Sequence, residues 1–191
     1  SMESNYYKKY KQYRKKYKQY KQFAGAFSEN EFLIDLYNSV DGPDWKNTDF
    51  LKLSVNESGG ITLDKNDNII SIILNDLTIR GGILNSIGTL QYLKTLNLSN
   101  NMLQGHIPSS IYKLSQLETL DLNSNKFNGT ISTSIEKLKK IKSLDLGNNL
   151  FTGIIPGTIG NLNKLNALIL SENKFQGSIP NSIGNLKSLK N

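Results

Sequence analysis

Residues 93–116 read LKTLNLSNNMLQGHIPSSIYKLSQ, and this pattern recurs along the chain at a fixed spacing of 24 residues. Related copies begin at Leu117 (LETLDLNSNKFNGTISTSIEKLKK), Ile141 (IKSLDLGNNLFTGIIPGTIGNLNK) and Leu165 (LNALILSENKFQGSIPNSIGNLKS). A more divergent fifth copy, IISIILNDLTIRGGILNSIGTLQY, begins at Ile69. A fixed period of this length indicates a repeat architecture in which each copy forms one coil of a stack.

Each position of the repeat has a physical role. Leucines spaced as Leu93, Leu96 and Leu98 alternate as in a short strand whose apolar side faces inward. An asparagine follows, and its side-chain amide can bond to the backbone where the chain leaves the strand. After it come an apolar residue, which should stack on its equivalents in the other copies, and a glycine, which permits a sharp turn. The three columns are Asn101, Asn125, Asn149, Asn173; Leu103, Phe127, Phe151, Phe175; and Gly105, Gly129, Gly153, Gly177.

One copy buries too little apolar surface to fold alone, so stacked copies must share a core. The sequence therefore predicts a solenoid with one parallel strand per repeat and coils about 4.8 Å apart. We expect five copies over residues 69–191, with an open or truncated C-terminal coil that could self-associate.

Residues 69–191, with their L-x-G-x-I-P pattern, resemble the plant-type leucine-rich repeat (LRR) proteins, which include receptor-kinase ectodomains and polygalacturonase-inhibiting proteins. The resemblance implies an α/β solenoid, a right-handed superhelix with one short parallel strand per 24-residue repeat. It extends to residues 25–68, where Tyr37-Asn38, Gly42-Pro43-Asp44-Trp45 and Gly60-Ile61-Thr62 are similar to an N-terminal helix-plus-hairpin cap. Plant caps commonly carry cysteine pairs, and this chain has no cysteine.

The cap is also predicted from the residues themselves. Ser28-Glu29-Asn30-Glu31 is a capping box that opens a helix. Two apolar runs, residues 61–63 and 69–74, flank a polar turn and predict a hairpin. Its outer strand would cover the first edge of the repeat sheet.

The net charge of +7 is concentrated in a tail, residues 1–24, and the rest of the chain is neutral by count. Tyrosines recur in this tail at heptad-like spacing, which favours a basic amphipathic helix, although like charges four residues apart also suit a disordered tail. The tail would bind nucleic acid or anionic membrane, or remain a solvated appendage. Interleaved Tyr and Lys also resemble terminal runs of giant-virus proteins. The tail cations are Lys8, Lys9, Lys11, Arg14, Lys15, Lys16, Lys18 and Lys21.

Composition disfavours an enzyme, a metal site and a cofactor. The chain has no cysteine and a single histidine, His106, which removes thiolate chemistry and paired histidine ligands. No apolar run is long enough to span a membrane, and no signal peptide precedes the cap. We therefore expect an intracellular location, in the host cell or virion if the chain is viral.

The strand (concave) face is the candidate partner-binding surface, although its small, polar and mildly acidic residues also suit a plain solvated face. Asp121 and Asp145 lie one coil apart and mimic a catalytic carboxylate pair, but the repeat itself places them there. We expect a non-catalytic protein–protein interaction module that binds a protein or peptide. The alternatives are a polysaccharide- or glycosidase-binding inhibitor and a scaffold tethered by the tail. The candidate residues are Thr95, Asn97, Ser99, Thr119, Asp121, Asn123, Ser143, Asp145, Asn148 and Glu172.

Overall fold

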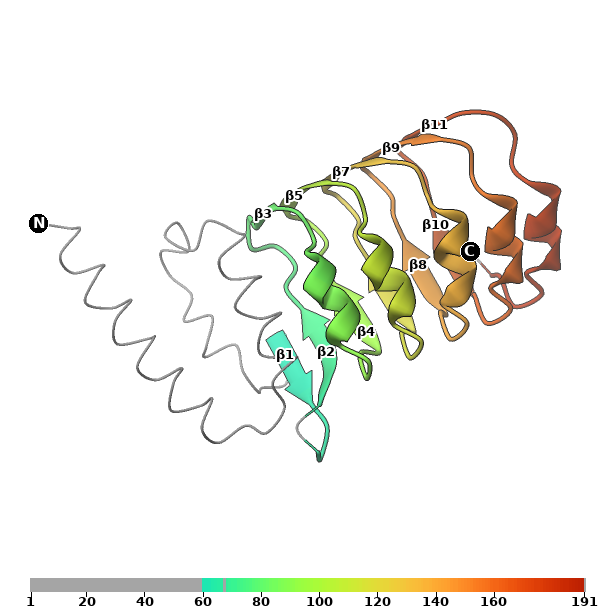
Figure 1. Cartoon of the computed structure of the whole chain (residues 1–191). Coiled ribbons are helices and arrows are strands. Elements are labelled where there is room, and N and C mark those ends of the chain that lie inside the picture. Colours follow the sequence, from blue (N-terminus) through green and yellow to red (C-terminus); the bar gives the residue numbers. More distant parts are fainter. Residues whose placement is uncertain (1–59, 67, 191) are drawn as a thin grey trace, which may run out of the picture.

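A computed structural model describes residues 60–66 and 68–190, which form a row of stacked coils (Figure 1). The coils follow one another in chain order from the hairpin to the last helical turn. The predicted tail and the cap as far as residue 59 lie outside the described residues, so those predictions and the domain boundaries remain untested. The predicted solenoid is confirmed.

A six-stranded sheet lines one side of the row, with strand order β1-β2-β4-β6-β8-β10. From β2 onward all pairs are parallel and in register, so equivalent positions of successive copies lie side by side. Strands β4, β6 and β8 bury their central leucine and direct the flanking residues outward, as the alternation predicts. The bounds are β1 Gly60–Leu63, β2 Ile69–Ile73, β4 Thr95–Asn97, β6 Thr119–Asp121, β8 Ser143–Asp145 and β10 Ala167–Ile169.

The predicted hairpin is present at the N-terminal edge of this sheet. Strand β1 pairs antiparallel with β2, with Gly60 opposite Ile73. Asp64 closes the turn because its Oδ1 accepts the backbone N–H groups of Asn66 at 2.8 Å and Asn68 at 3.0 Å. Hydrogen bonds from the Asn68 side chain and backbone lower the pKa of the Asp64 carboxyl. The hairpin therefore covers the edge strand β2 with a paired strand.

A second, five-stranded parallel sheet runs along another side of the coils in the order β11-β9-β7-β5-β3 (Figure 1). The sequence predicts one strand per repeat, and the structure adds this second, shorter one. It forms where the apolar column stacks, with Phe127 and Phe151 rings 6.4 Å apart and nearly parallel. The turn after it needs a left-handed residue, and Gly129 has φ +81° there. The bounds are β3 Arg80–Gly81, β5 Met102–Gly105, β7 Lys126–Gly129, β9 Leu150–Gly153 and β11 Lys174–Phe175.

Each coil closes through a five-residue 3₁₀ helix. Pro108 occupies the N-cap position of the second one, where its fixed φ suits the entry into the helix. The third has no proline, and Ser132 caps it instead by accepting the Ser134 N–H at 3.1 Å. The bounds are η1 Asn85–Thr89, η2 Ser109–Lys113, η3 Thr133–Lys137, η4 Gly157–Asn161 and η5 Asn181–Asn185.

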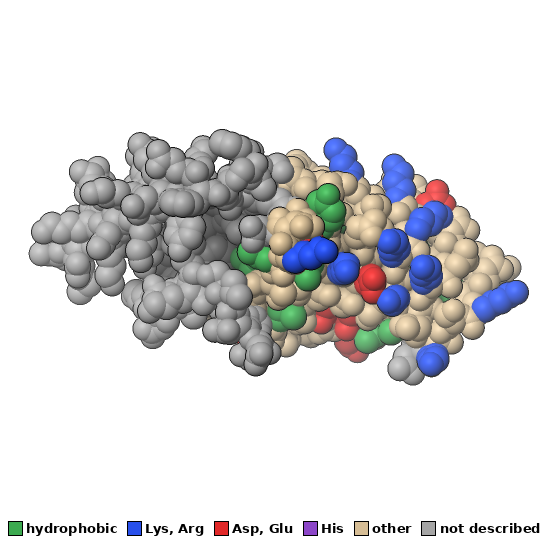
Figure 2. Space-filling view, turned by 90° about the horizontal axis from the view of Figure 1, so that it is seen from below, with side chains coloured by type: hydrophobic (Ala, Val, Ile, Leu, Met, Phe, Trp, Pro, Cys, Tyr) green, Lys and Arg blue, Asp and Glu red, His purple; other side chains and the backbone are tan. Residues whose placement is uncertain are grey.

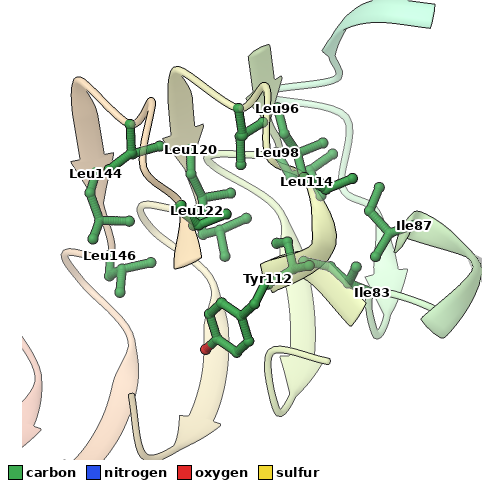
Figure 3. Close-up of a cluster of buried hydrophobic side chains, with 14 of the residues drawn as sticks. Ile83, Ile87, Leu96, Leu98, Tyr112, Leu114, Leu120, Leu122, Leu144 and Leu146 are labelled. Carbon is green, nitrogen blue, oxygen red and sulfur yellow. The ribbon is translucent and has the colours of Figure 1, made fainter. Parts of the chain in front are cut away.

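The core is a continuous column between the first sheet and the helical turns. Two leucines per coil form parallel rows within it, such as Leu120 with Leu122 and Leu144 with Leu146 (Figure 3). All four of these side chains are fully buried. The core thus continues from coil to coil without a gap, as shared burial between repeats requires.

The asparagine column joins neighbouring coils, as predicted. Asn149 donates from Nδ2 to the Leu122 carbonyl of the preceding coil at 2.9 Å and to the Gly147 carbonyl of its own coil at 2.9 Å. Its Oδ1 accepts the Phe127 N–H at 3.0 Å. Asn125 repeats the pattern but is only half-buried. This ladder holds the strand face at a fixed register.

Candidate interaction surface

The strand face, defined here as the outward side of β2, β4, β6, β8 and β10, carries the candidate residues in columns. Thr95, Thr119 and Ser143 are direct neighbours across the sheet, and all three are half-buried. Asn97 and Asp121 are likewise in register in the next column, followed by Asp145 on β8. The structure therefore brings together the six strand residues that the sequence places on this face.

The four remaining candidates lie where the chain leaves the strands. Asn148 and Glu172 are exposed and adopt left-handed conformations, with φ of +50° and +54°. Asn123 is half-buried, and Ser99 is only 7% exposed. The Ser99 hydroxyl donates to Asn97 Oδ1 at 2.7 Å, so it shapes the turn and offers little surface to a partner.

A hydrogen-bonded chain of side chains joins two neighbouring coils, those that begin at Leu117 and Ile141. Asn123 Nδ2 donates to Asp145 Oδ1 at 3.1 Å. The Ser124 hydroxyl donates to Asn123 Oδ1, and Asn148 Nδ2 donates in turn to the Ser124 hydroxyl at 3.1 Å. These bonds hold the polar side chains in defined positions and leave few of them to rearrange.

The two aspartates of the face support the backbone. Asp121 Oδ1 accepts the Asn123 N–H at 3.0 Å, and Asp145 Oδ1 accepts the Gly147 N–H at 2.9 Å. Asn97 makes the equivalent bond in the preceding coil without a charge. Burial raises the pKa of the Asp121 carboxyl, and the neighbouring charge of Asp145 raises it further. Each aspartate thus stabilises the turn at the end of its own strand, and the two lie side by side because the repeat places them there.

The described residues offer little else that could carry chemistry. Within residues 60–66 and 68–190, no cluster of three or more His, Cys, Asp or Glu side chains could hold a metal ion. In the same part of the chain, no helix has both the length and the apolar character to cross a bilayer.

The column that contains Asn97, Asp121 and Asp145 ends in an isoleucine on both sides, and neither isoleucine is among the candidates chosen from the sequence. Ile169 continues the Asn97–Asp121–Asp145 column and is 40% exposed. Ile73 occupies the other end of the same column and is half-buried. Both were visible in the aligned copies, but a search restricted to polar side chains passes over them.

Comparisons with known proteins agree with this geometry. Models described as leucine-rich repeats match residues 132–191, 92–114 and 116–138. The BIR3–SERK2 complex from Arabidopsis thaliana contains a similar structure, with 32% identity and a TM-score of 0.71, over 81% of this chain and 87% of that one. The LRR ectodomain of the Arabidopsis receptor kinase SOBIR1 is similar at 26% identity and a TM-score of 0.69, over 85% and 89% of the two chains.

A third similar structure is the plant peptide hormone receptor RGFR1 in complex with RGF2, at 32% identity and a TM-score of 0.63. The match covers 65% of this chain and 20% of the receptor. No curated protein sequence matches the chain significantly.

The intracellular location expected from the sequence is wrong in the light of these structures. The similar proteins include ectodomains of plant receptor kinases, which favours an extracellular location. One of the grounds for that expectation was the absence of cysteine. The described coils are joined by the leucine core and the asparagine ladder, neither of which needs a disulfide, so a cysteine-free composition does not require a reducing compartment.

The family assignment rests on three agreeing observations. The 24-residue period, the parallel strand with its asparagine ladder in each coil, and the overall match to plant receptor structures all point the same way. This chain belongs to the leucine-rich repeat proteins of the plant type.

Proposed function

We propose that the chain is a non-catalytic interaction module that holds a protein or peptide partner on its strand face. The observation that carries the proposal is the in-register column Thr95–Thr119–Ser143, half-exposed on a sheet fixed by backbone bonds on both sides. Such a surface presents hydroxyl groups at a spacing of about 4.8 Å, close to the spacing of strands in a sheet. Because the side chains and backbone of this surface are already ordered, binding a partner costs little conformational entropy on this side of the interface.

Two similar structures support a binding role. One is a complex that contains BIR3 and SERK2, and another is a receptor with the peptide hormone RGF2. A non-catalytic role is supported by Asp121 and Asp145, because each carboxylate is already engaged with the backbone of its own turn. The apolar Ile169 at the end of the face could supply a hydrophobic contact for the same partner.

The test is a matched pair of substitutions in the full chain. Thr119→Arg places a long charged side chain in the centre of the strand face, whereas Thr152→Arg makes the same change on β9 of the second sheet. Partners captured from extracts of the source organism would be identified by mass spectrometry, purified, and titrated against both variants and the unaltered chain.

We expect Thr119→Arg to weaken the binding of the purified partner at least tenfold and Thr152→Arg to change it less than twofold. Melting curves of both variants establish that they are folded. Equal affinity of the two variants for every purified partner would rule out the strand face as the binding surface.

A further inference from the structure

The charge of the described residues is strongly uneven. Five segments, each of which runs from the last residue of a 3₁₀ helix through the turn after it, are together called the basic edge. They are residues 89–94, 113–118, 137–142, 161–166 and 185–190. They contain nine lysines and one acidic residue, Glu118, a net charge of +8. The other described residues hold four cations and six carboxylates. The lysines are Lys94, Lys113, Lys137, Lys139, Lys140, Lys142, Lys164, Lys187 and Lys190.

All nine lysines are exposed, and Figure 2 shows Lys and Arg side chains gathered on this side of the stack. The edge forms because the repeat returns the chain to the same side every 24 residues. Neighbouring coils lie about 4.8 Å apart, less than the Debye length of about 8 Å at physiological ionic strength, so lysines on adjacent coils reinforce one another. Residues 25–191 are neutral by count only because residues 25–68 carry a net charge of −6, which offsets the +6 of the repeats and conceals the positive charge on this side.

The salt bridge and the lowered pKa of Glu118 indicate that positive charge surrounds it. Lys142 Nζ lies 2.5 Å from Glu118 Oε2, and among residues 60–66 and 68–190 this is the one salt bridge. The hydrogen bond from Lys142 lowers the pKa of the Glu118 carboxyl, and the charges of Lys94 and Lys140 lower it further. Lys140 instead donates to Gln116 Oε1 at 2.5 Å. One carboxylate is thus shared by several cations, and the excess positive charge faces solvent.

The other side chains of the edge indicate what could bind there. Neutral hydrogen-bonding groups lie between the lysines, including Gln91, Asn163 and Asn166, all of them exposed. Tyr92, 52% exposed, is the single exposed large aromatic or apolar side chain in the five segments. Single-stranded nucleic acid is normally bound by several stacking aromatics, and a bilayer surface by inserted apolar side chains. Lysines interleaved with amides fit carboxylates and peptide groups better.

We propose that the basic edge is a second interaction surface, which binds an acidic segment of a protein partner. Its lysines would pair with Asp or Glu side chains, and its amides would bond to the peptide backbone between them. The surface is separate from the strand face, since it consists of the loops that precede the strands. Electrostatic complementarity of this kind accelerates association and fixes the orientation of the partner, and salt weakens it.

The test uses the full chain and a fluorescein-labelled peptide of alternating glutamate and serine, followed by fluorescence anisotropy over a range of salt concentrations. The edge variant is Lys113→Gln/Lys139→Gln/Lys164→Gln/Lys187→Gln, which leaves the Lys142–Glu118 pair intact. The matched control removes the same charge from the four other described cations, as Lys65→Gln/Arg80→Gln/Lys126→Gln/Lys174→Gln. A third variant replaces the eight cations of residues 1–24 by glutamine.

We expect the edge variant to bind the peptide at least tenfold more weakly at low salt and with a flatter salt dependence, and the control to bind within threefold of the unaltered chain. Equal losses in the edge and control variants would overturn the proposal, because net charge alone would then explain them. Binding that disappears only in the tail variant would overturn it as well. A chain that binds phosphatidylserine vesicles or an anionic polysaccharide, but not the peptide, would assign the edge to another class of ligand.

Discussion

At the scale of single residues, the asparagine side chains hydrogen-bond to backbone groups of neighbouring coils, a role that side chains rarely have in other folds. Asn149 is 5% exposed and bonds only to main-chain atoms, two of them in the preceding coil. Removing its amide leaves the Phe127 N–H and the Leu122 carbonyl without these bonds in a buried place. Such unpaired backbone groups are costly because water cannot replace the lost partner.

We predict that Asn149→Ala lowers the free energy of unfolding by about 1–3 kcal/mol. Urea denaturation followed by circular dichroism measures the change. Asn128→Ala is the control, because Asn128 is exposed and lies outside the ladder. If both variants unfold at the same urea concentration as the unaltered chain, the ladder does not stabilise the coils.

Asp121, in contrast to Asn149, carries a charge that lowers the stability of the folded state. Its pKa is raised in the folded state by burial and by Asp145, so the native state binds a proton more tightly than the unfolded chain. The free energy of unfolding should therefore rise as the pH falls through the Asp121 pKa, and the penalty is fully present above it. Asn97 shows that an uncharged amide can make the same turn contact.

Asp121→Asn should accordingly raise the stability at neutral pH by about 0.2–1 kcal/mol, the usual size of a repulsion between neighbouring like charges. The gain should shrink as the pH is lowered towards the acid range. Thermal unfolding from neutral to acid pH measures it, with Glu172→Gln as a control at an exposed position. A variant that is less stable than the unaltered chain at neutral pH would contradict the assignment.

At the scale of elements, close packing of the 3₁₀ helix η4 against the next coil limits side-chain volume at Gly160. Gly160 in η4 and Gly184 in η5 are equivalent, one period apart. A Cβ on Gly160 would lie 2.7 Å from the Ser182 Cβ of the next coil and closer still to the Ser182 carbonyl oxygen. A Cβ on Gly184 would meet no atom within 4 Å. The same glycine thus has a packing role in one coil that it lacks in the other.

This difference predicts opposite effects of one substitution. Gly160→Ala should destabilise the chain by about 1–3 kcal/mol, because rigid backbone must move to admit the methyl group. Gly184→Ala should be neutral or stabilising by about 0.4–1 kcal/mol, since it only restricts the unfolded chain. Differential scanning calorimetry of the two variants distinguishes them. Equal losses in both would mean that helix geometry, and not contact between coils, selects glycine at this position.

At the scale of the whole molecule, burial is uneven from coil to coil. Leu120 and Leu144 are fully buried, whereas their equivalent in the last described coil, Leu168, is half-buried. Ile131 is 4% exposed, and its equivalent Ile179 is 71% exposed. A stack of repeats gains stability from interfaces between neighbours, so a coil with less buried surface should open more often.

We therefore predict that, within the described coils of the 191-residue chain, backbone amides after Ile179 exchange with deuterium fastest. Amides of β6 and β8 should be the slowest. Hydrogen exchange followed by mass spectrometry of peptic fragments measures both. Protection that is uniform as far as Lys190 would show that the last coil is covered, for example by a second copy.

The period explains which features could be predicted from the sequence. Once the copies are aligned, Phe127, Asn149 and Gly153 have assigned places, because every coil must repeat the same backbone path. The second sheet was not predicted, because its strands contain two to four residues and bury at most one side chain each, which is too short for an alternation to stand out in the sequence. The basic edge could have been found by sorting the lysines by repeat position. The neutral count over residues 25–191 hid it, since the acidic residues of 25–68 offset the lysines of the repeats.

The asparagine ladder has a consequence for how such a chain can change. Within the preceding coil each amide contacts only the main chain, so the ladder bonds do not depend on which side chains the neighbouring copy carries. A duplication or loss of one whole copy would therefore leave the ladder bonds intact at every remaining junction. The length of the surface offered to a partner would then grow or shrink in steps of one coil, while the composition of each step could vary independently of its neighbours.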